Sequence, residues 1–275
     1  MENRNRKNYA LQSVDRALQI LSLFSEQTPE LSLTEISRRM EMSNPVTLKY
    51  LNTLAQRGFL ARDCQTKRYS LGLALAALGG IVRRNHAVSQ AAYPIMEKLA
   101  ATVGESVYLQ VPVLSNDEAV VLEMVETKQA VISRFESTCK LYAGASRKVL
   151  LAYLGEDYFQ QFLQRVNMQP YTEKTNIDMQ QLREEIQLIR QQGYAISYGE
   201  TVEGACGIAA PVFDAAGIAA SLMIYVPQYR MDERVQDFHL KHVLRAAQEI
   251  SERLGGGETI RPTNGSSDIS EKEQV

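Results

Sequence analysis

Cysteine, histidine and tryptophan are scarce in this sequence of 275 residues, which has three cysteines, three histidines and no tryptophan. Because Cys64, Cys139 and Cys206 lie far apart, the sequence offers no disulfide framework and no CxxC metal site. Long hydrophobic runs are also missing, and no uninterrupted apolar stretch reaches the ~18 residues of a membrane span. The first residues lack the apolar segment that a secretion signal needs. We therefore expect a cytoplasmic protein that does not cross a membrane.

Residues suited to catalysis are equally scarce. His86, His239 and His242 have no acidic or cysteine pattern beside them that would complete a metal site. Cys206 is either a reactive thiol or a small buried strand residue, and the second role is the commoner one. Glu200 and a neighbouring glutamate could act as acid and base, but such pairs more often lie on a solvated loop. We predict that the protein is not an enzyme and holds no metal or cofactor.

The charge of the sequence is unevenly distributed, although the formal net charge is only -2. Residues 1–85 contain 13 Lys and Arg against 7 Asp and Glu, a charge of +6. The remaining residues contain 17 against 25, a charge of -8. A basic part joined to a larger acidic part indicates that the first part faces a polyanion. Clustering of charges by chance on solvated faces would produce the same counts.

Apolar periodicity and turn residues divide the basic part into short elements. Helical spacing predicts three helices, and two strand-like runs joined by a polar turn predict a hairpin. A fourth helical segment follows and contains Gly79 and Gly80, a pair that weakens a helix and marks a bend. In chain order, these helices and strands are predicted over residues 12–25, 32–40, 45–57, 59–63, 67–72 and 73–85.

Capping residues support two of these helices. Ser32 and Glu35 have the spacing of a capping box, in which each side chain accepts a hydrogen bond from the backbone of the other residue. Asn44 is expected to cap the next helix, with Pro45 in the first position, where no amide donor is missed. Gly58 is placed to end that helix.

After a helix predicted over 89–104, capped by Ser89 and ended by Gly104, the pattern changes to alternating strands and amphipathic helices. This pattern predicts an α+β domain with a mainly antiparallel sheet. Strands are predicted over 106–114, 118–127, 130–137, 194–200, 206–214 and 218–227, and helices over 144–154, 156–166, 178–193 and 232–254. The last residues lack an apolar face, which predicts disorder.

Two capped helices followed by a basic hairpin are typical of a winged helix-turn-helix, whose second helix enters the major groove by its N-terminal end. Pro45 presets the backbone there, and the amides of a helix start can meet a phosphate. The hairpin would be the wing, with Lys67 and Arg68 against the DNA backbone or the minor groove. Any one of these basic residues, taken alone, is more often a solvated surface charge. The predicted DNA-binding residues are Ser32, Thr34, Ser43, Asn44, Pro45, Val46, Thr47, Lys49, Tyr50, Arg57, Lys67 and Arg68.

Four parts of the sequence together resemble the isocitrate-lyase-regulator (IclR) family of bacterial transcription regulators. One is similar to the first helix of the family and one to its winged helix-turn-helix. The other two, LYAGASRKVLLAYL and GYAISYGETVEGACGIAAPVFDAAG, are similar to a loop-and-helix segment and to the hallmark segment of the second domain. These parts lie at residues 13–24, 31–72, 141–154 and 193–217, and the resemblance extends from residue 10 to about 254.

The resemblance implies the organisation of the whole chain. A winged helix-turn-helix DNA-binding domain is expected over 10–72, a linker helix over 73–88, and an effector-binding and oligomerisation domain over 89–254. The second domain would have a GAF/PAS-like fold with a curved, mainly antiparallel sheet, and residues 255–275 would be a disordered tail. The protein would be a homodimer or homotetramer that regulates transcription, expected as a repressor, on a near-palindromic operator in double-stranded DNA. A small organic-acid effector would modulate its DNA affinity.

The resemblance also implies where the effector binds, although the sequence departs from the family pattern at several of these positions. Tyr142, Gly144 and Arg147 replace the usual loop residues. Related proteins often have Asp, Cys or Ser at the strand positions held here by Ser197, Gly207, Met223 and Tyr225, so the site is expected to be less acidic, with the phenol of Tyr225 as a donor. The implied effector-binding residues are Val131, Ser133, Ala145, Ser146, Ser197, Ala205, Gly207, Met223 and Tyr225.

The loop over 142–147 is expected to bind the acid group. Small residues there keep side chains away, so that backbone amides such as those of Gly144 and Ala145 can face an anion. Arg147 and Lys148 would add positive charge just beyond.

Two other functions remain open from the sequence. The second domain could serve only in oligomerisation, or the protein could be a small-molecule enzyme with a vestigial winged module. The basic charge of the first 85 residues favours DNA binding over the enzyme.

Overall fold

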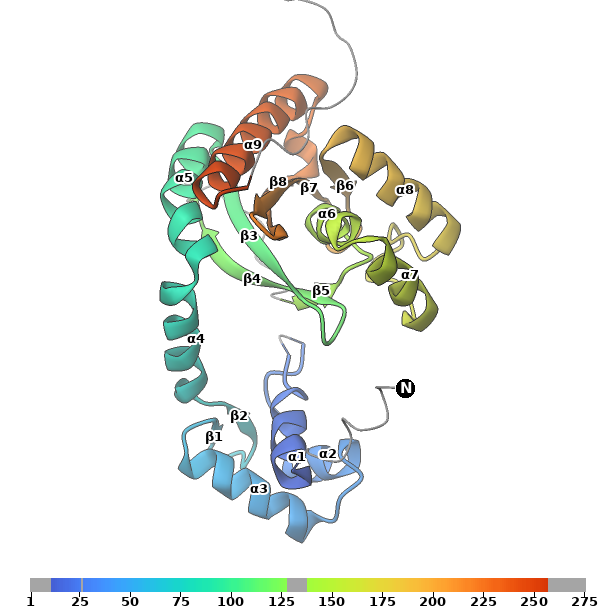
Figure 1. The fold of residues 1–275 in the computed structure, drawn as a ribbon. Coiled ribbons are helices and arrows are strands. Elements are labelled where there is room, and N and C mark those ends of the chain that lie inside the picture. Colours follow the sequence, from blue (N-terminus) through green and yellow to red (C-terminus); the bar gives the residue numbers. More distant parts are fainter. Residues whose placement is uncertain (1–10, 26, 128–137, 257–275) are drawn as a thin grey trace, which may run out of the picture. The chain divides into compact units, whose positions relative to one another are not determined.

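The structure is a computed structural model that describes residues 11–25, 27–127 and 138–256. The chain divides into two compact units, residues 1–84 and 85–275. In Figure 1 the first unit is blue to teal, and the second, built around a larger sheet, runs from green to red. The predicted strand over 130–137 lies outside the described residues.

Within its described residues, the first unit consists of helices and a two-stranded hairpin. Strands β1 and β2 are antiparallel, with Ala61 opposite Ser70. Leu31 forms a further bridge to Tyr69, through one backbone hydrogen bond in each direction. The elements are α1 (Gln12–Leu21), α2 (Leu33–Arg39), α3 (Asn44–Gln56), β1 (Leu60–Arg62), β2 (Tyr69–Leu71) and α4 (Leu73–Asn85).

The core of this unit holds α3 by one face only. Ile20 from α1, Ile36 from α2 and Leu51 from α3 are fully buried together. Leu60 and Tyr69 from the hairpin close the cluster. Because the apolar residues of α3 face this core, its opposite face stays in solvent.

The predicted capping box is present. The amide of Ser32 donates to the Glu35 carboxylate at 2.7 Å, and the amide of Glu35 donates to the Ser32 hydroxyl at 3.3 Å. The predicted cap of α3 was wrong by one residue, because Ser43 is the N-cap and Asn44 is already helical. Helix α1 ends at Leu21 rather than at residue 25, where the chain turns to bury Phe24 in the core.

Helix α4 is continuous from Leu73 to Asn85, so Gly79 and Gly80 do not interrupt it. The break falls at His86, which is the N-cap of α5 (Ala87–Val103). Ser89 was predicted to be this cap, and that prediction was wrong. Its side chain is buried and its hydroxyl donates to the carboxylate of Glu123, so a tertiary contact overrides the local capping signal.

The second unit is built on a six-stranded sheet of antiparallel neighbours in the order β5-β4-β3-β8-β7-β6, counted within the described residues. Its strands are β3 (Ser106–Val113), β4 (Glu118–Val125), β5 (Thr138–Lys140), β6 (Ala195–Tyr198), β7 (Ala205–Asp214) and β8 (Gly217–Pro227). Its remaining helices are α6 (Ala145–Tyr153), α7 (Glu156–Arg165), α8 (Met179–Gln192) and α9 (Glu233–Arg253). The sequence did not predict β5 as a strand.

Side chains alternate between the two faces of this sheet. Residues such as Val107 and Ile224 pack with α5 and α9. Their neighbours Tyr108, Met223 and Tyr225 pack on the other face with α6, α7 and α8. Figure 1 shows α5 and α9 on one side of the sheet and α6 on the other. We call these the α5 face and the α6 face.

A β-bulge lies between β3 and β4 at Leu109 and Gln110. Leu109 pairs with Glu123 and Gln110 pairs with Val121, so Leu122 is the additional residue. The bulge leaves Gln110 and Val121 on the α6 face, while Leu109 and Glu123 face α5.

At the other end of the chain, Gly255 forms a bridge to Asp214, so order extends beyond residue 254. The rest of the predicted tail lies outside the described residues. No helix in the described part of the chain has both the length and the apolar character of a membrane span.

Candidate functional site

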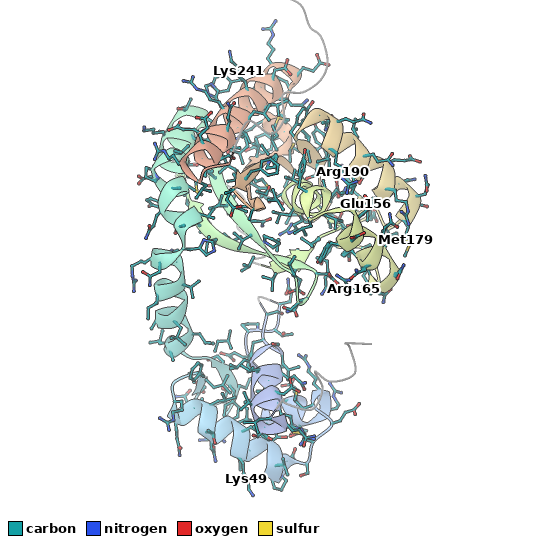
Figure 2. All side chains as sticks on the ribbon, in the orientation of Figure 1. Lys49, Glu156, Arg165, Met179, Arg190 and Lys241 are labelled. Atoms are coloured by element: carbon teal, nitrogen blue, oxygen red, sulfur yellow. The ribbon has the colours of Figure 1, made fainter. Side chains whose placement is uncertain are left out.

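Helix α3 exposes its N-terminal turn to solvent. Asn44, Pro45 and Val46 are exposed there, and Lys49 is exposed one turn further along. The side chain of Ser43 makes no capping hydrogen bond, although the residue is exposed at the helix start. Figure 2 shows Lys49 directed outward from α3. The first two turns of α3 thus present a hydroxyl, a carboxamide and a cation to solvent.

Asp63 organises the turn between β1 and β2. Its carboxylate accepts hydrogen bonds from the amides of Thr66 at 2.6 Å and Gln65 at 2.8 Å, and from the Thr66 hydroxyl at 2.9 Å. The hydrogen bonds from Thr66 hold the pKa of Asp63 below its usual value. Lys67 follows with a positive φ of 59° and is exposed, and its ammonium group donates to the Cys64 carbonyl, so the hairpin holds a cation on a defined turn.

Three residues predicted to contact DNA have structural partners. Thr47 is fully buried, and its hydroxyl donates to the Ser43 carbonyl at 3.1 Å. Ser32 takes part in the capping box described above. Arg68 donates to the Glu35 carboxylate at 2.9 Å and so joins the wing to the start of α2. Burial excludes Thr47 as a DNA contact, whereas Ser32 and Arg68 are half-buried and their DNA contacts stay predictions beside these internal hydrogen bonds.

The other predicted residues of this unit differ in exposure. Thr34 and Arg57 are exposed. Tyr50 is half-buried and packs against the core.

In the second unit, the start of α6 meets the sheet on its α6 face. The amide of Ala145 donates to the Ser197 hydroxyl at 3.0 Å. Gly207 lies beside both, because a Cβ at Gly207 would be 3.2 Å from the Ser197 Oγ and 3.6 Å from the Ala145 Cβ. The same Cβ would be 3.3 Å from the Met223 sulfur. The fold therefore brings together four residues that the resemblance assigned to the effector site.

Tyr225 borders this cluster, opposite Gly207 in the sheet register. Its ring packs edge-to-face on Tyr108, with ring centroids 6.3 Å apart. Burial raises the pKa of Tyr225 to about 12, against the lowering effects of a hydrogen bond from Thr201 and the charge of Arg147. The phenol therefore stays protonated at neutral pH, close to the buried guanidinium of Arg147.

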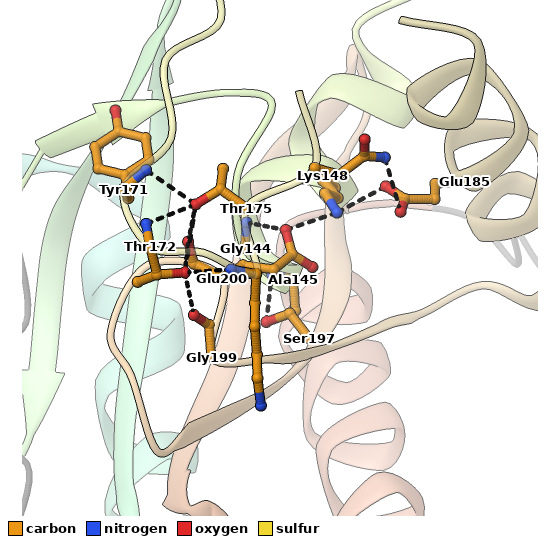
Figure 3. Close-up of polar contacts among 12 residues, drawn as sticks. Gly144, Ala145, Lys148, Tyr171, Thr172, Thr175, Glu185, Ser197, Gly199 and Glu200 are labelled. Carbon is orange, nitrogen blue, oxygen red and sulfur yellow. Dashed lines mark hydrogen bonds and ion pairs between the residues drawn. The ribbon is translucent and has the colours of Figure 1, made fainter. Parts of the chain in front are cut away.

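The start of α6 is not open to an anion in the way that the sequence predicted. The Glu200 carboxylate accepts a hydrogen bond from the Gly144 amide at 3.1 Å and pairs with Lys148 at 2.7 Å. Lys148 is buried and also pairs with Glu185 at 2.7 Å (Figure 3). The expectation of free amides at Gly144 and Ala145 and a free charge at Lys148 was wrong, because side chains of the protein occupy them.

Two threonines hold the loop that carries Glu200 (Figure 3). The Thr172 hydroxyl donates to the Gly199 carbonyl and the Thr175 hydroxyl to the Glu200 carbonyl, each at 2.6 Å. Thr175 Oγ1 also accepts hydrogen bonds from the amides of Tyr171 and Thr172. The sequence does not predict this network, because its members lie in distant segments without a shared motif.

Of the four remaining predicted effector residues, the structure describes two. The Ser146 hydroxyl is buried and has no hydrogen-bond partner among the described residues. Ala205 is buried on β7, two residues before Gly207. Val131 and Ser133 lie outside the described residues.

The candidate nucleophile and acid–base residues are not arranged for catalysis. Burial raises the pKa of the Cys206 thiol to about 12, which keeps it protonated and unreactive at neutral pH. Burial lowers the pKa of His239, whose side chain packs inside the unit. Among the described residues, no group of three His, Cys, Asp or Glu side chains is placed to hold a metal.

Lys148→Met keeps the side-chain length but removes the charge that Glu185 and Glu200 share. We expect the free energy of unfolding to fall by about 3 kcal/mol, near the lower end for breaking a buried ion pair, because Glu185 is partly exposed. Urea denaturation measures this change. Lys241→Met, at an exposed position of α9 (Figure 2), is the matched control and should shift stability by less than about 0.5 kcal/mol. Equal losses in the two variants would contradict the role of Lys148.

Comparison with known proteins covers both units. The family model of the IclR helix-turn-helix domain matches residues 13–63, and that of the bacterial transcriptional regulator IclR C-terminal region matches residues 81–252. The chain is 31% identical to the HTH-type transcriptional regulator XynR of Escherichia coli over 248 residues, which cover 89% of this chain and 98% of that protein.

Solved structures share the fold. An IclR transcriptional regulator from Alicyclobacillus acidocaldarius has a TM-score of 0.78 and 25% identity, covering 90% of this chain and all of that chain. An IclR homologue from Microbacterium hydrocarbonoxydans, solved with 4-hydroxybenzoate, has a TM-score of 0.71 and 23% identity, covering 88% and 98% of the two chains. The relatives are regulators, which confirms the prediction that this protein is not an enzyme. The chain belongs to the IclR family of DNA-binding, effector-modulated transcriptional regulators.

Proposed function

We propose that the first unit binds a near-palindromic operator through the exposed start of α3 and through the wing. The observation that carries this proposal is the exposure of Ser43, Asn44 and Lys49 on the first two turns of α3, opposite the face that enters the core. Lys67 on the wing supplies a phosphate contact. Thr47 supports this surface from inside the core, and Ser32 and Arg68 join the start of α2 to the wing through Glu35.

We further propose that the protein binds DNA as a dimer, alone or as a pair of dimers. Two winged units related by a two-fold axis would read half-sites about one helical turn apart, ~10 bp. Apolar side chains on α4 and near α1 are exposed on the chain, which a monomer would leave in water. These are Leu11, Val14, Leu18, Leu73, Leu78, Ile81 and Val82.

The effector, in our proposal, is a small organic acid held on the α6 face between the start of α6 and strands β6 to β8. Because Gly207 lacks a side chain, Ser197, Met223 and Ala145 approach the sheet closely there, and the buried Ser146 hydroxyl beside Ala145 has no partner among the described residues. Arg147 supplies the positive charge and Tyr225 a protonated phenol. The homologue solved with 4-hydroxybenzoate supports an acid as the ligand class.

Effector binding at this place would act on α6 and on the loop of Glu200, which contact each other directly. An effector that prefers one arrangement of these segments shifts the protein toward it. We propose that the free protein represses transcription and that the effector lowers its affinity for the operator.

Lys49→Ala and Lys67→Ala should each weaken binding to operator DNA from the region upstream of this protein's own coding sequence. Each change removes one phosphate contact, so the slope of log affinity against log salt should fall by about one unit, with similar losses on unrelated DNA. Fluorescence anisotropy over a series of salt concentrations measures both quantities. Lys241→Ala serves as the control. If the slopes are unchanged in both variants, neither α3 nor the wing contacts DNA as proposed.

Ile81→Glu should dissociate the dimer, because it puts a charge into an apolar surface that becomes buried on association. Sedimentation velocity at micromolar concentration should then show a monomer. Leu188→Glu changes a similarly exposed apolar residue on α8 and should leave the dimer intact. A wild-type monomer, or a dimer unaffected by Ile81→Glu, would refute the proposed interface.

Gly207→Ala should abolish the response to small carboxylates, because the new Cβ would press on Ser197 and on the Met223 sulfur. A thermal-shift screen of the wild type with aliphatic and aromatic carboxylates identifies a stabilising acid, and calorimetry then compares the variants. Gly79→Ala is the matched control, since a Cβ there meets no neighbour within 4 Å. Equal affinities in Gly207→Ala and the wild type would place the site elsewhere. A wild type that binds no acid would leave the second unit a purely oligomerising domain.

A further inference from the structure

Two polar side chains on the α6 face have no hydrogen-bond partner among the described residues. Gln110 on β3 and Ser221 on β8 are both 0% exposed. Neither the oxygen nor the nitrogen of the Gln110 carboxamide is paired within the described part of the chain, and the same holds for the Ser221 hydroxyl. Buried carboxamides and hydroxyls normally have partners, because losing water without gaining a hydrogen bond is costly.

These two side chains are neighbours. Gln110 lies directly opposite Ser221 in the antiparallel register of β3 and β8. Directly opposite residues have Cβ atoms about 5 Å apart and point to the same face, so one bound group can contact both. The β-bulge between Leu109 and Gln110 sits at the same place, and bulges commonly redirect side chains beside functional sites.

The pair also adjoins the proposed effector site. Ser221 is two residues before Met223 on the same strand and the same face, a distance of about 7 Å along β8. The Met223 sulfur lies near Gly207, which pairs with Tyr225 at the other end of this row. The Met223 side chain therefore points toward Gly207 rather than toward Ser221.

The unpaired atoms define the chemistry of their partner. A carboxamide offers an N–H donor and a C=O acceptor side by side, and a serine hydroxyl both donates and accepts. A carboxylate lacks a donor for the carboxamide oxygen, and an aromatic ring lacks both partners. Two hydroxyl groups on adjacent carbons match the carboxamide, because one accepts from its nitrogen while the other donates to its oxygen. Ser221 can then bond either hydroxyl.

We propose that Gln110 and Ser221 form a second, uncharged subsite that binds a vicinal diol of the effector, which makes the effector a polyhydroxy acid. This inference rests on the proposed effector site, because the acid group would be bound near Arg147 and Tyr225.

Calorimetry on the full-length protein tests the subsite with two matched series of acids. One series is threonate, ribonate and gluconate, and the other is butanoate, pentanoate and hexanoate, which have the same chain lengths without hydroxyl groups. At the best-fitting length, the polyhydroxy acid should bind the wild type at least about tenfold more tightly, as expected for two or more additional hydrogen bonds. Gln110→Leu should remove this preference.

The melting temperature of the free protein separates a binding role from a structural one. Because the Gln110 carboxamide has no partner in the described part of the chain, Gln110→Leu should not lower it. A carboxamide held by buried water would give the opposite result, a lower melting temperature with the preference retained, and would overturn the proposal. Gln164→Leu, at an exposed position of α7, is the control and should keep the preference for polyhydroxy acids.

The outcomes distinguish the subsite from the effector site itself. If acids bind without a preference for hydroxyl groups, or if Gln110→Leu keeps the preference, the diol subsite is wrong and the acid site stands. If neither series binds the wild type, both proposals fail together.

Discussion

The buried charge of Lys148 fixes the start of α6, and the proposed effector site is built on that start. An ammonium group withdrawn from water costs several kcal/mol unless partners replace its hydration, and Glu185 and Glu200 do so here. Glu200 then also accepts the hydrogen bond of the Gly144 amide, so its loop is joined to α6. Any change in the position of α6 must therefore move or break this ion pair.

The two units use the start of a helix in opposite ways. The first three residues of α3, Asn44 to Val46, are exposed, and the Ser43 side chain caps no amide there. The first amides of α6 are already occupied by Glu200 and the Ser197 hydroxyl. An incoming acid on the α6 face must therefore use Arg147 and the polar side chains, or else displace Glu200. Displacement would remove one of the two carboxylates that pair with Lys148. Binding of the acid would then be coupled to the position of the loop that carries Glu200.

Local signals in the sequence predicted the first unit well, because a capping box at Ser32 or a Pro in the first turn of α3 acts within a few residues. Predictions failed where a contact with a residue distant in sequence determines the local structure. Ser89, for example, donates its hydroxyl to Glu123 instead of capping a helix. The cluster of Ala145, Ser197 and Gly207 came from family resemblance, not from periodicity. Gln110 lay in a correctly predicted strand, but its lack of a partner depends on the packing around it.

Whether a buried polar group has a hydrogen-bond partner depends on packing, and the two faces of the sheet differ in this respect. On the α5 face, Ser89 and Glu123 satisfy each other, and this pair helps to hold α5 on the sheet. On the α6 face, Gln110 and Ser221 are equally buried but make no such pair in the described part of the chain. A site with unpaired donors and acceptors discriminates strongly, because a ligand without matching groups leaves them unsatisfied. The same unpaired groups lower the stability of the free protein, so here binding selectivity and folding stability oppose each other.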